Sequence, residues 1–512
     1  MRRYLTVLCF LLVPIFFLGN VLAQDIASFE KQTTVKVLKN GLTVVLCERP
    51  EAPVFSFFTI VDAGAVQDPE GQGGMAHMFE HEAFKGTDRI GTTNYAKEKV
   101  ALEKVEQAWA AYDHEDRKEL GRDAKKVADL KAAFDKAVEE ANQYVIKNRF
   151  GEIVDREGGV GMNASTGMDS TQYFYSMPVN RLETWAYLES SRFRTPVLRE
   201  FYKERDVVHE ERRLRTDSNP IGKLIEQFTS TAYAAHPYHH SGVGWPSEID
   251  HLSATDAAKF YRTYYVPSNT VIALVGALKP EQVFPIMEKY FGPIPSSPKP
   301  QPLITAEPEQ VAERTVVMHD RSQPFYIEGY HRPSYKDPDD AVYAVISDLI
   351  SSGRTSRMYR ALVRDQKIAA FAGGFSGLPG TKYPGLFSFI AVPVPGHTPQ
   401  EMGKAIHEQI ERLKSEDVSD EELQMVKTRA KANLIRGLAN NQGLAIQLGT
   451  NQLRFGDWRE LFRRVDKIDK VSKADIRRVA NKAFVDKNRT VAMIENDAPK
   501  PGAGDAQKKE SR

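Results

Sequence analysis

Two histidines and a glutamate near the start of the chain have the spacing of a metal site. His77, Glu80 and His81 stand at offsets 0, +3 and +4, so on a helix of 3.6 residues per turn their side chains share one face. Two neutral imidazoles one turn apart can bind one Zn²⁺, and the carboxylate between them can take a proton from a water that the metal activates. The spacing therefore predicts Zn²⁺ on His77 and His81, with Glu80 as general base. The alternative is an amphipathic helix whose histidines are ordinary polar groups.

A second helix offers a third ligand. In the segment 201–215, a step of 100° per residue places Glu204 and Glu211 in the apolar stripe of the helix. A buried, unpaired carboxylate costs several kcal/mol, so each of the two needs a cation or a hydrogen-bond network. We expect Glu211 to be the third zinc ligand and Glu204 to support the site or its substrate. The alternative is that both carboxylates pair with arginines on a solvated face, such as Arg205, Arg212 or Arg215.

The segments around the motif predict a mixed structure. Residues 33–46 alternate apolar and polar side chains around Asn40-Gly41, which is a strong hairpin signal, and residues 54–61 continue as a strand. A second hairpin is predicted at 161–177, followed by a helix over 181–192. Between them, residues 94–146 lack proline and predict two long amphipathic helices that reverse near 114–121. The sequence leaves open whether this helical hairpin lies on the body of the protein or binds a partner.

The first 23 residues have the features of a secretory signal peptide. Two arginines precede an apolar run over residues 4–18, and Val21-Leu22-Ala23 offers small residues at −3 and −1 of a cleavage site after Ala23. We therefore expect a periplasmic or secreted protein without a stable membrane span, because the run is shorter than the roughly 20 residues that a span needs. An uncleaved N-terminal anchor is the alternative. The 69 basic and 68 acidic residues leave no charge excess that would recruit nucleic acid.

Several motifs together resemble one family. H-x-x-E-H followed by Phe84-Lys85-Gly86-Thr87, the segment from Asn163-Ala164 to Tyr173, and the segment from Glu204-Arg205 to Glu210-Glu211 are similar to the pitrilysin/insulinase (M16) zinc peptidases, especially the short two-domain branch that includes mitochondrial processing peptidase. The order H-x-x-E-H is the inverse of H-E-x-x-H. The resemblance implies Zn²⁺ on His77, His81 and Glu211, with Glu80 as base. It also implies that Asn163 and Ala164 border an edge strand to which an extended peptide substrate adds.

An internal repeat supports two similar halves. The segment 484–495 echoes the segment 265–276, each with an aromatic residue, a turn with asparagine and a buried strand. We expect an α+β chain of two homologous α/β-sandwich domains that form a clamshell. The predicted domains are a zinc-binding domain at 24–292 with the helical hairpin inserted at 95–147, a proline-rich linker at 293–310, a non-catalytic domain at 311–497 and a disordered tail at 498–512.

The chain departs from the family pattern in two places. His81 and Glu211 are 211 − 81 = 130 positions apart, which is longer than usual in the family, and the helical insertion accounts for the excess. The family often has an arginine and a tyrosine seven residues apart that hold substrate carbonyls. Here Arg364 is present as a candidate substrate-binding residue, but Phe371 replaces the tyrosine.

These patterns predict an exported zinc metalloendopeptidase that cleaves peptides or unfolded segments. The missing tyrosine leaves open a homodimer, or a heterodimer in which this chain holds the zinc and a homologous M16 subunit supplies the tyrosine. The alternatives are a peptide-binding or scaffolding protein of the same fold, and an assembly subunit that depends on the helical hairpin.

Overall fold

The computed structural model describes residues 26–496. The predicted signal peptide (1–23) and the predicted tail (498–512) lie outside the described residues. Within 26–496, none of the helices has the length and apolar character needed to cross a membrane.

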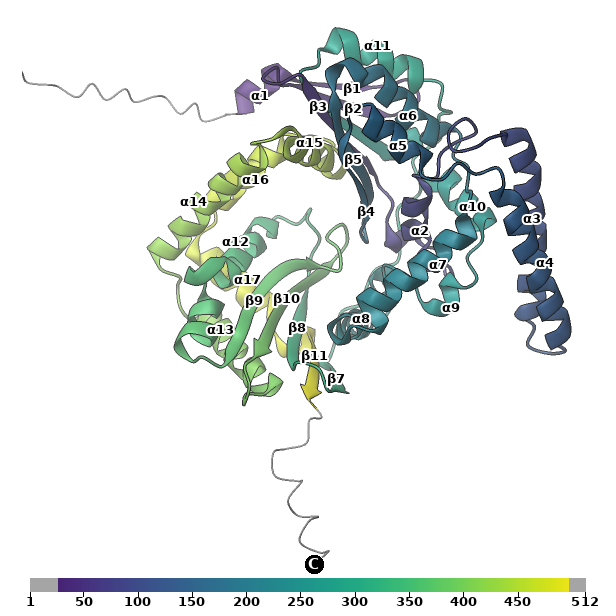
Figure 1. Cartoon of the computed structure of the whole chain (residues 1–512). Coiled ribbons are helices and arrows are strands. Elements are labelled where there is room, and N and C mark those ends of the chain that lie inside the picture. Colours follow the sequence, from purple (N-terminus) through teal and green to yellow (C-terminus); the bar gives the residue numbers. More distant parts are fainter. Residues whose placement is uncertain (1–25, 497–512) are drawn as a thin grey trace, which may run out of the picture.

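The first half of the chain forms a six-stranded sheet (Figure 1). The pair β2–β6 is parallel and the other pairs are antiparallel. The predicted hairpin at Asn40-Gly41 is confirmed, because Val37 pairs with Thr43 across it. In spatial order, the strands are β1 (Thr33–Val37), β2 (Thr43–Glu48), β6 (Thr270–Gly276), β3 (Val54–Val61), β5 (Thr171–Pro178) and β4 (Val160–Thr166).

The second half forms a five-stranded sheet with the same order of equivalent strands. Its parallel pair, β7–β11, corresponds to β2–β6, and it lacks a counterpart of β1 among the described residues. The predicted α+β class with two homologous halves is therefore confirmed. In spatial order, the strands are β7 (Arg314–Asp320), β11 (Arg489–Asn496), β8 (Phe325–Arg332), β10 (Gly385–Pro393) and β9 (Ala369–Leu378).

The repeated asparagines make the same contacts in both halves. The side-chain amide of Asn269 donates to Tyr264 O (2.9 Å) and to Asp62 O at the end of β3 (3.3 Å). The amide of Asn488 donates to Ala483 O (2.9 Å) and to His331 O in β8 (2.9 Å). Each asparagine thus ties the end of a helix to a neighbouring strand, so the sequence repeat is a structural repeat.

Helices cover both sheets. Those of the first half are α1 (Ile26–Gln32), α2 (Met75–Glu82), α3 (Tyr95–Asp116), α4 (Ala124–Asn142), α5 (Arg149–Arg156), α6 (Leu182–Arg194), α7 (Phe201–Arg212), α8 (Pro220–Ala232), α9 (Pro246–Ile249), α10 (Ala254–Tyr264) and α11 (Pro280–Tyr290). Those of the second half are α12 (Asp340–Ser351), α13 (Pro399–Ser415), α14 (Asp420–Gly437), α15 (Asn441–Phe455), α16 (Glu460–Asp469) and α17 (Lys473–Ala483). The helical hairpin is α3 and α4, which pack against each other and project from the first half (Figure 1). The proline-rich segment 293–310 contains neither helix nor strand.

Each sheet is covered on one face by a helix from the other half. Helix α15 packs on β3 and β6, and α8 packs on β7 and β11. Both crossings are close: a Cβ atom on Gly449 of α15 would lie 2.7 Å from the Phe58 ring, and one on Gly329 of β8 would lie 2.7 Å from the Phe228 ring of α8. The two halves therefore share apolar cores and are joined by more than the linker.

This exchange of helices predicts cooperative unfolding. Leu448 on α15 is fully buried among residues of the first sheet, so Leu448→Ala should lower the free energy of unfolding by about 2–5 kcal/mol. We expect calorimetry to show one thermal transition, for the wild type and the variant alike, because one face of each sheet is covered by a helix of the other half. Ile435→Ala, at a mostly exposed position of α14, is the control and should change stability little. Two separate transitions in the wild type would contradict this coupling.

Candidate metal centre

The metal-motif helix α2 begins at a tightly specified turn. Gly74 has φ 88°, and a Cβ atom there would lie 2.3 Å from Val243 O, so only glycine fits. The Asp68 carboxylate accepts hydrogen bonds from the backbone N–H groups of Gly74 (2.7 Å) and Ala76 (2.8 Å). Asp68 therefore fixes the start of α2, and with it the direction in which the histidines point.

Three candidate ligand atoms converge where α2 meets α7. Glu211 Oε2 lies 3.4 Å from His77 Nε2 and 3.4 Å from His81 Nε2. The ligand atoms of these three residues all lie within 4.8 Å of one another. His77 is buried, whereas His81 and Glu211 are partly exposed. The structure therefore brings together the three residues that the sequence pattern proposed as ligands.

These separations fit a tetrahedral Zn²⁺ ion. Two ligand atoms that are each about 2.1 Å from zinc at a tetrahedral angle lie about 3.4 Å apart, which is the separation found between Glu211 and each histidine. Two imidazole nitrogens and one carboxylate oxygen are also a ligand set that catalytic zinc sites use. The residues present therefore fit the metal, and they leave a fourth position free for water or substrate.

The charges at the centre are arranged to favour a cation. A hydrogen bond from His77 outweighs the opposing effect of burial and lowers the pKa of the Glu211 carboxyl to about 2. Burial lowers the pKa of His81, but the carboxylates of Glu204, Glu211 and Glu80 outweigh this effect and raise it. The second oxygen of Glu211 lies 2.5 Å from Arg215. The arginine pairing considered as an alternative is thus present, but it occupies only Oε1 and leaves Oε2 directed at the histidines.

Glu204 supports the centre from the side. Its carboxylate lies 3.4 Å from His81 Nδ1 and 2.5 Å from Lys85 Nζ. A carboxylate on the outer nitrogen of an imidazole fixes the ring orientation and leaves Nε2 for a metal. Lys85, which the sequence analysis quoted only as part of a motif, holds this carboxylate in place. Arg205 makes no such pair and lies over the Trp109 ring instead.

Glu82 follows the motif directly and is an unusual residue for its position. Its side chain is 2% exposed, and neither carboxyl oxygen has a hydrogen-bond partner among the described residues. Burial raises its pKa well above the usual value near 4.5, so the carboxyl group tends to keep its proton. The sequence shows that a glutamate follows the motif, but no sequence pattern indicates that this side chain is buried.

Arg199 holds together three segments around the centre. Its guanidinium is buried and pairs with Glu98 of α3 at 2.7 and 3.1 Å. It also donates to the carbonyl groups of Lys85 (2.7 Å), Thr87 (2.7 Å) and Ile90 (2.9 Å). All five N–H groups thus have acceptors. Arg199 connects the helical hairpin to the loop that carries Lys85, and no sequence motif indicates this role.

A cavity of about 320 Å³ opens beside the centre. Glu80 and His81 line it together with Asn163 and Ala164 of β4, which is an end strand of its sheet. The segment after the helical hairpin supplies a further wall, with Val145, Ile146 and Asn148. The candidate base and the predicted substrate strand therefore border one space, and the insertion shapes it.

The second-half residues lie elsewhere in the described structure. Arg364 is exposed, pairs with Asp365 at 2.6 and 3.0 Å, and does not line the cavity. Phe371 is 51% exposed on β9, the end strand of the second sheet. A substrate-binding role for Arg364 stays a prediction.

Comparisons with known proteins match most of the chain. A model of the family "Peptidase M16 inactive domain" matches residues 251–430. The zinc protease PqqE of Helicobacter pylori is 29% identical over 467 residues, which cover 89% of this chain and 91% of that protein. The crystal structure of a protease from Helicobacter pylori matches with a TM-score of 0.74 and 27% identity over 90% of this chain and 99% of that chain. The predicted resemblance to the M16 peptidases is therefore confirmed, over about nine-tenths of this chain.

More distant M16 relatives extend the match. A probable mitochondrial-processing peptidase subunit beta of Arabidopsis thaliana is 24% identical over 481 residues, covering 90% of this chain and 78% of that protein. The periplasmic protease PqqL of Escherichia coli shares the fold, with a TM-score of 0.67 at 16% identity, over 94% of this chain and 50% of that chain. The matched range 251–430 contains none of His77, Glu80, His81 and Glu211. The relatives named as zinc proteases support a peptidase-like function for the whole chain.

The Arg199 contacts predict a large loss of stability when its partner is removed. Glu98→Ala leaves a buried guanidinium without its counter-charge, which should cost about 3–5 kcal/mol of unfolding free energy. Urea unfolding measures this, with Glu119→Ala at an exposed hairpin position as the control. A loss below about 1 kcal/mol would place the pair among weak surface ion pairs.

Glu82 predicts a specific dependence of stability on pH. Below about pH 4.5 both the folded and the unfolded states hold its proton. Above that pH only the folded state holds it, so stability falls by up to about 1.4 kcal/mol per pH unit until the folded pKa is reached. Glu82→Gln removes this titration. We therefore measure the free energy of unfolding of both proteins in urea with EDTA present. The value for Glu82→Gln minus the value for the wild type should be larger at pH 8 than at pH 5. Equal differences at both pH values would contradict the buried titration.

Proposed function

We propose that this chain is a zinc metalloendopeptidase that hydrolyses peptides or unfolded segments. The observation that carries the proposal is the convergence of His77 Nε2, His81 Nε2 and Glu211 Oε2 at separations that fit tetrahedral zinc. Glu80 lines the adjoining cavity without being one of the three ligands. Three ligands and an adjacent carboxylate that is not a ligand are an arrangement that zinc-dependent peptide hydrolysis uses.

His77, His81 and Glu211 would hold the metal, and Zn²⁺ in this position would supply a Lewis acid for water and for the scissile carbonyl. Glu80 would take the proton from the attacking water and pass it to the leaving amine. Glu204 keeps Nε2 of His81 directed at the metal position through its contact with Nδ1. The end strand β4 has a neighbouring strand on one side only, so an extended peptide would add as a further strand at its other edge, beside Asn163 and Ala164.

The site of action follows from the sequence before the described residues. The basic and apolar residues at 1–23 favour export to the periplasm or secretion. An exported peptidase of this kind would act on peptides and unfolded segments outside the cytoplasm.

A second candidate is a peptidase that needs a homologous M16 partner. Phe371 carries no hydroxyl group where the family often has a tyrosine, and its side chain is exposed and able to face a partner or substrate. In that case this chain would supply the zinc and the base, and the partner would supply the missing donor. A scaffolding protein of the same fold is weaker, because the chain retains all four residues of the zinc and base set.

Comparison of the wild type with Glu80→Gln tests the function. We expect both proteins to bind about one zinc per chain, because Glu80 is not a ligand, and we expect the variant to lose at least about 10²-fold in cleavage, because it lacks the base. Zinc is measured by mass spectrometry and cleavage with a quenched fluorescent peptide library. Glu119→Gln, a neutral change on the exposed hairpin, should leave both values unchanged.

The other outcomes separate the candidates. Zinc in both proteins without cleavage by either would favour the partner-dependent enzyme, and Phe371→Tyr should then raise the activity of the single chain. No zinc in either protein would refute the metal centre itself.

A further inference from the structure

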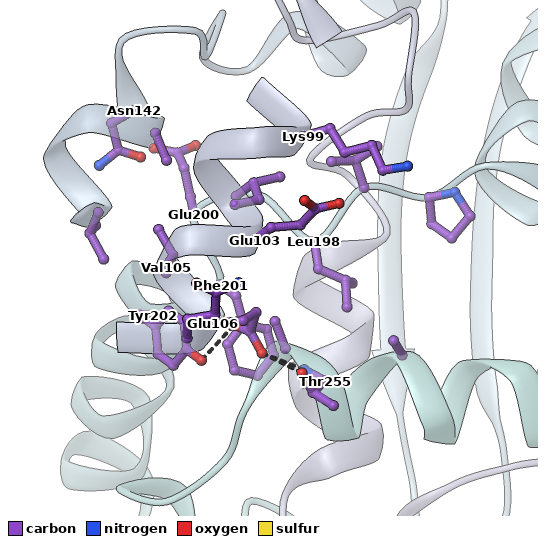
Figure 2. A pocket seen from close by; sticks show the side chains of 18 of the residues that line it. Lys99, Glu103, Val105, Glu106, Asn142, Leu198, Glu200, Phe201, Tyr202 and Thr255 are labelled. Atoms are coloured by element: carbon purple, nitrogen blue, oxygen red, sulfur yellow. Dashed lines mark hydrogen bonds between the residues drawn. The ribbon is translucent and has the colours of Figure 1, made fainter. Parts of the chain in front are cut away.

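A second cavity lies between the helical hairpin and the body of the first half. It has a volume of about 500 Å³, within the range of small-molecule sites. Helices α3 and α4 form one side, and the segment 196–202 with α10 forms the other. Figure 2 shows this cavity, with Glu103 and Glu106 from α3 and Phe201 and Tyr202 from α7. The metal-centre cavity is a different space, although Glu200 lines both.

The lining combines apolar and aromatic surface with carboxylates. Its apolar part includes Leu102, Val105, Val138, Leu198 and Phe201. Such surface suits the body of an organic ligand, because it removes apolar area from water. The Phe201 and Tyr202 rings are almost fully buried, and the Arg205 guanidinium already lies over the Tyr202 ring, so the two rings add apolar surface.

The carboxylates of α3 in this cavity have no cationic partner. Glu106 accepts hydrogen bonds from the Tyr202 hydroxyl (2.7 Å) and from the backbone N–H (2.9 Å) and hydroxyl (2.6 Å) of Thr255, and all three donors are neutral (Figure 2). Neither Glu103 nor Glu106 takes part in any ion pair of the described chain, although Lys99 lines the same cavity. Glu200, by contrast, lies 3.2 Å from Lys203. The α3 wall thus presents two carboxylates outside any direct ion pair, of which Glu103 is exposed to solvent.

We propose that this cavity is a binding site for an organic cation, an ammonium or guanidinium group on an apolar body. The cation would lie between Glu103 and Glu106, and the apolar body would rest on the floor between α4 and α7. A charge-assisted hydrogen bond from the ligand to a carboxylate would then hold the cation. The position of Lys99 at the rim opposes such a ligand, so Lys99 sets a limit on its affinity.

Two sources share this ligand chemistry. One is a lysine or arginine side chain of a bound peptide, in which case the cavity would select substrates near the metal centre; this source rests on the proposed peptidase function. The other is a free amine, which would bind whether or not the chain is a peptidase. The helical hairpin forms the carboxylate wall in both cases, which gives this insertion a function in binding.

The test is isothermal titration of the full-length Glu80→Gln protein, which removes cleavage from the measurement. The probes are N-acetyl-Phe-Arg-amide for the peptide source and 2-phenylethylamine for the free amine. N-acetyl-Phe-citrulline-amide is the uncharged match of the first probe. We expect saturable binding of at least one cationic probe. The arginine peptide should bind at least about tenfold more tightly than the citrulline peptide if peptides are the source.

Variants locate the site. Glu103→Gln should weaken binding of the cationic probe about five- to tenfold, and Lys99→Met should strengthen it about two- to fivefold, because one removes an attracting and the other a repelling charge. Ala141→Trp, which fills the floor, should abolish binding. Two controls should leave the affinity unchanged: Glu119→Gln on the exposed hairpin, and Met162→Trp, which fills the metal-centre cavity instead.

Each outcome decides the proposal. Binding of the amine alone, or of the peptide alone, supports the site and identifies its source. Equal affinity for arginine and citrulline peptides without amine binding would overturn it. An affinity that Glu103→Gln and Ala141→Trp both leave unchanged would overturn it as well, and so would the absence of saturable binding by either cationic probe. Because no step needs zinc or cleavage, a failure here is distinct from a failure of the peptidase proposal.

Discussion

The candidate centre depends on one contact between helices that are far apart in the sequence, the meeting of α2 with α7. It brings Glu211 Oε2 to 3.4 Å from the Nε2 atoms of His77 and His81. A shift of α7 by one turn, about 5.4 Å, would remove the carboxylate from the group. The structure prevents such a shift with fixed polar contacts, because buried charges tolerate few alternative positions. Arg199 just before α7 binds the loop after α2, and Asp68 fixes the start of α2.

The exchange of helices between the two halves extends this constraint to the whole chain. The three candidate ligands lie on helices of the first half, yet one face of the first sheet is covered by α15 of the second half. The second half is therefore part of the core on which the centre rests. A repeat in which each half could fold alone would not need Gly449 and Gly329 at these two crossings between the halves.

Local patterns predicted most of the elements and the ligand set. His77, Glu80 and His81 share a helix face by periodicity alone. Glu211 was selected as a carboxylate in a predicted apolar stripe, of which Val208 is buried whereas Val207 is exposed. Asn269 and Asn488, at matching positions of two similar segments, indicated the repeat. Periodicity cannot identify Arg199, because its acceptors are carbonyl groups and a glutamate on other segments. The burial of Glu82 is also a property of packing: the same residue on an exposed helix face would be unremarkable. Its cost in free energy appears only when its neighbours are placed.

The helical hairpin at 95–147 shows why a long insertion close to the H-x-x-E-H motif can leave the motif intact. Its two ends lie side by side, because Thr92 bridges Val145 and the Ile146 N–H donates to Gly91 O at 3.0 Å. The segments before and after it are therefore held at the spacing that a short loop would give, and the added helices project without displacing α2 or α7. The added segment nevertheless lies against α7. Its end lines the metal-centre cavity with Val145 and Ile146, and its helix α3 lines the second cavity. An insertion anchored in this way can alter ligand selection near the centre while the ligand geometry stays fixed.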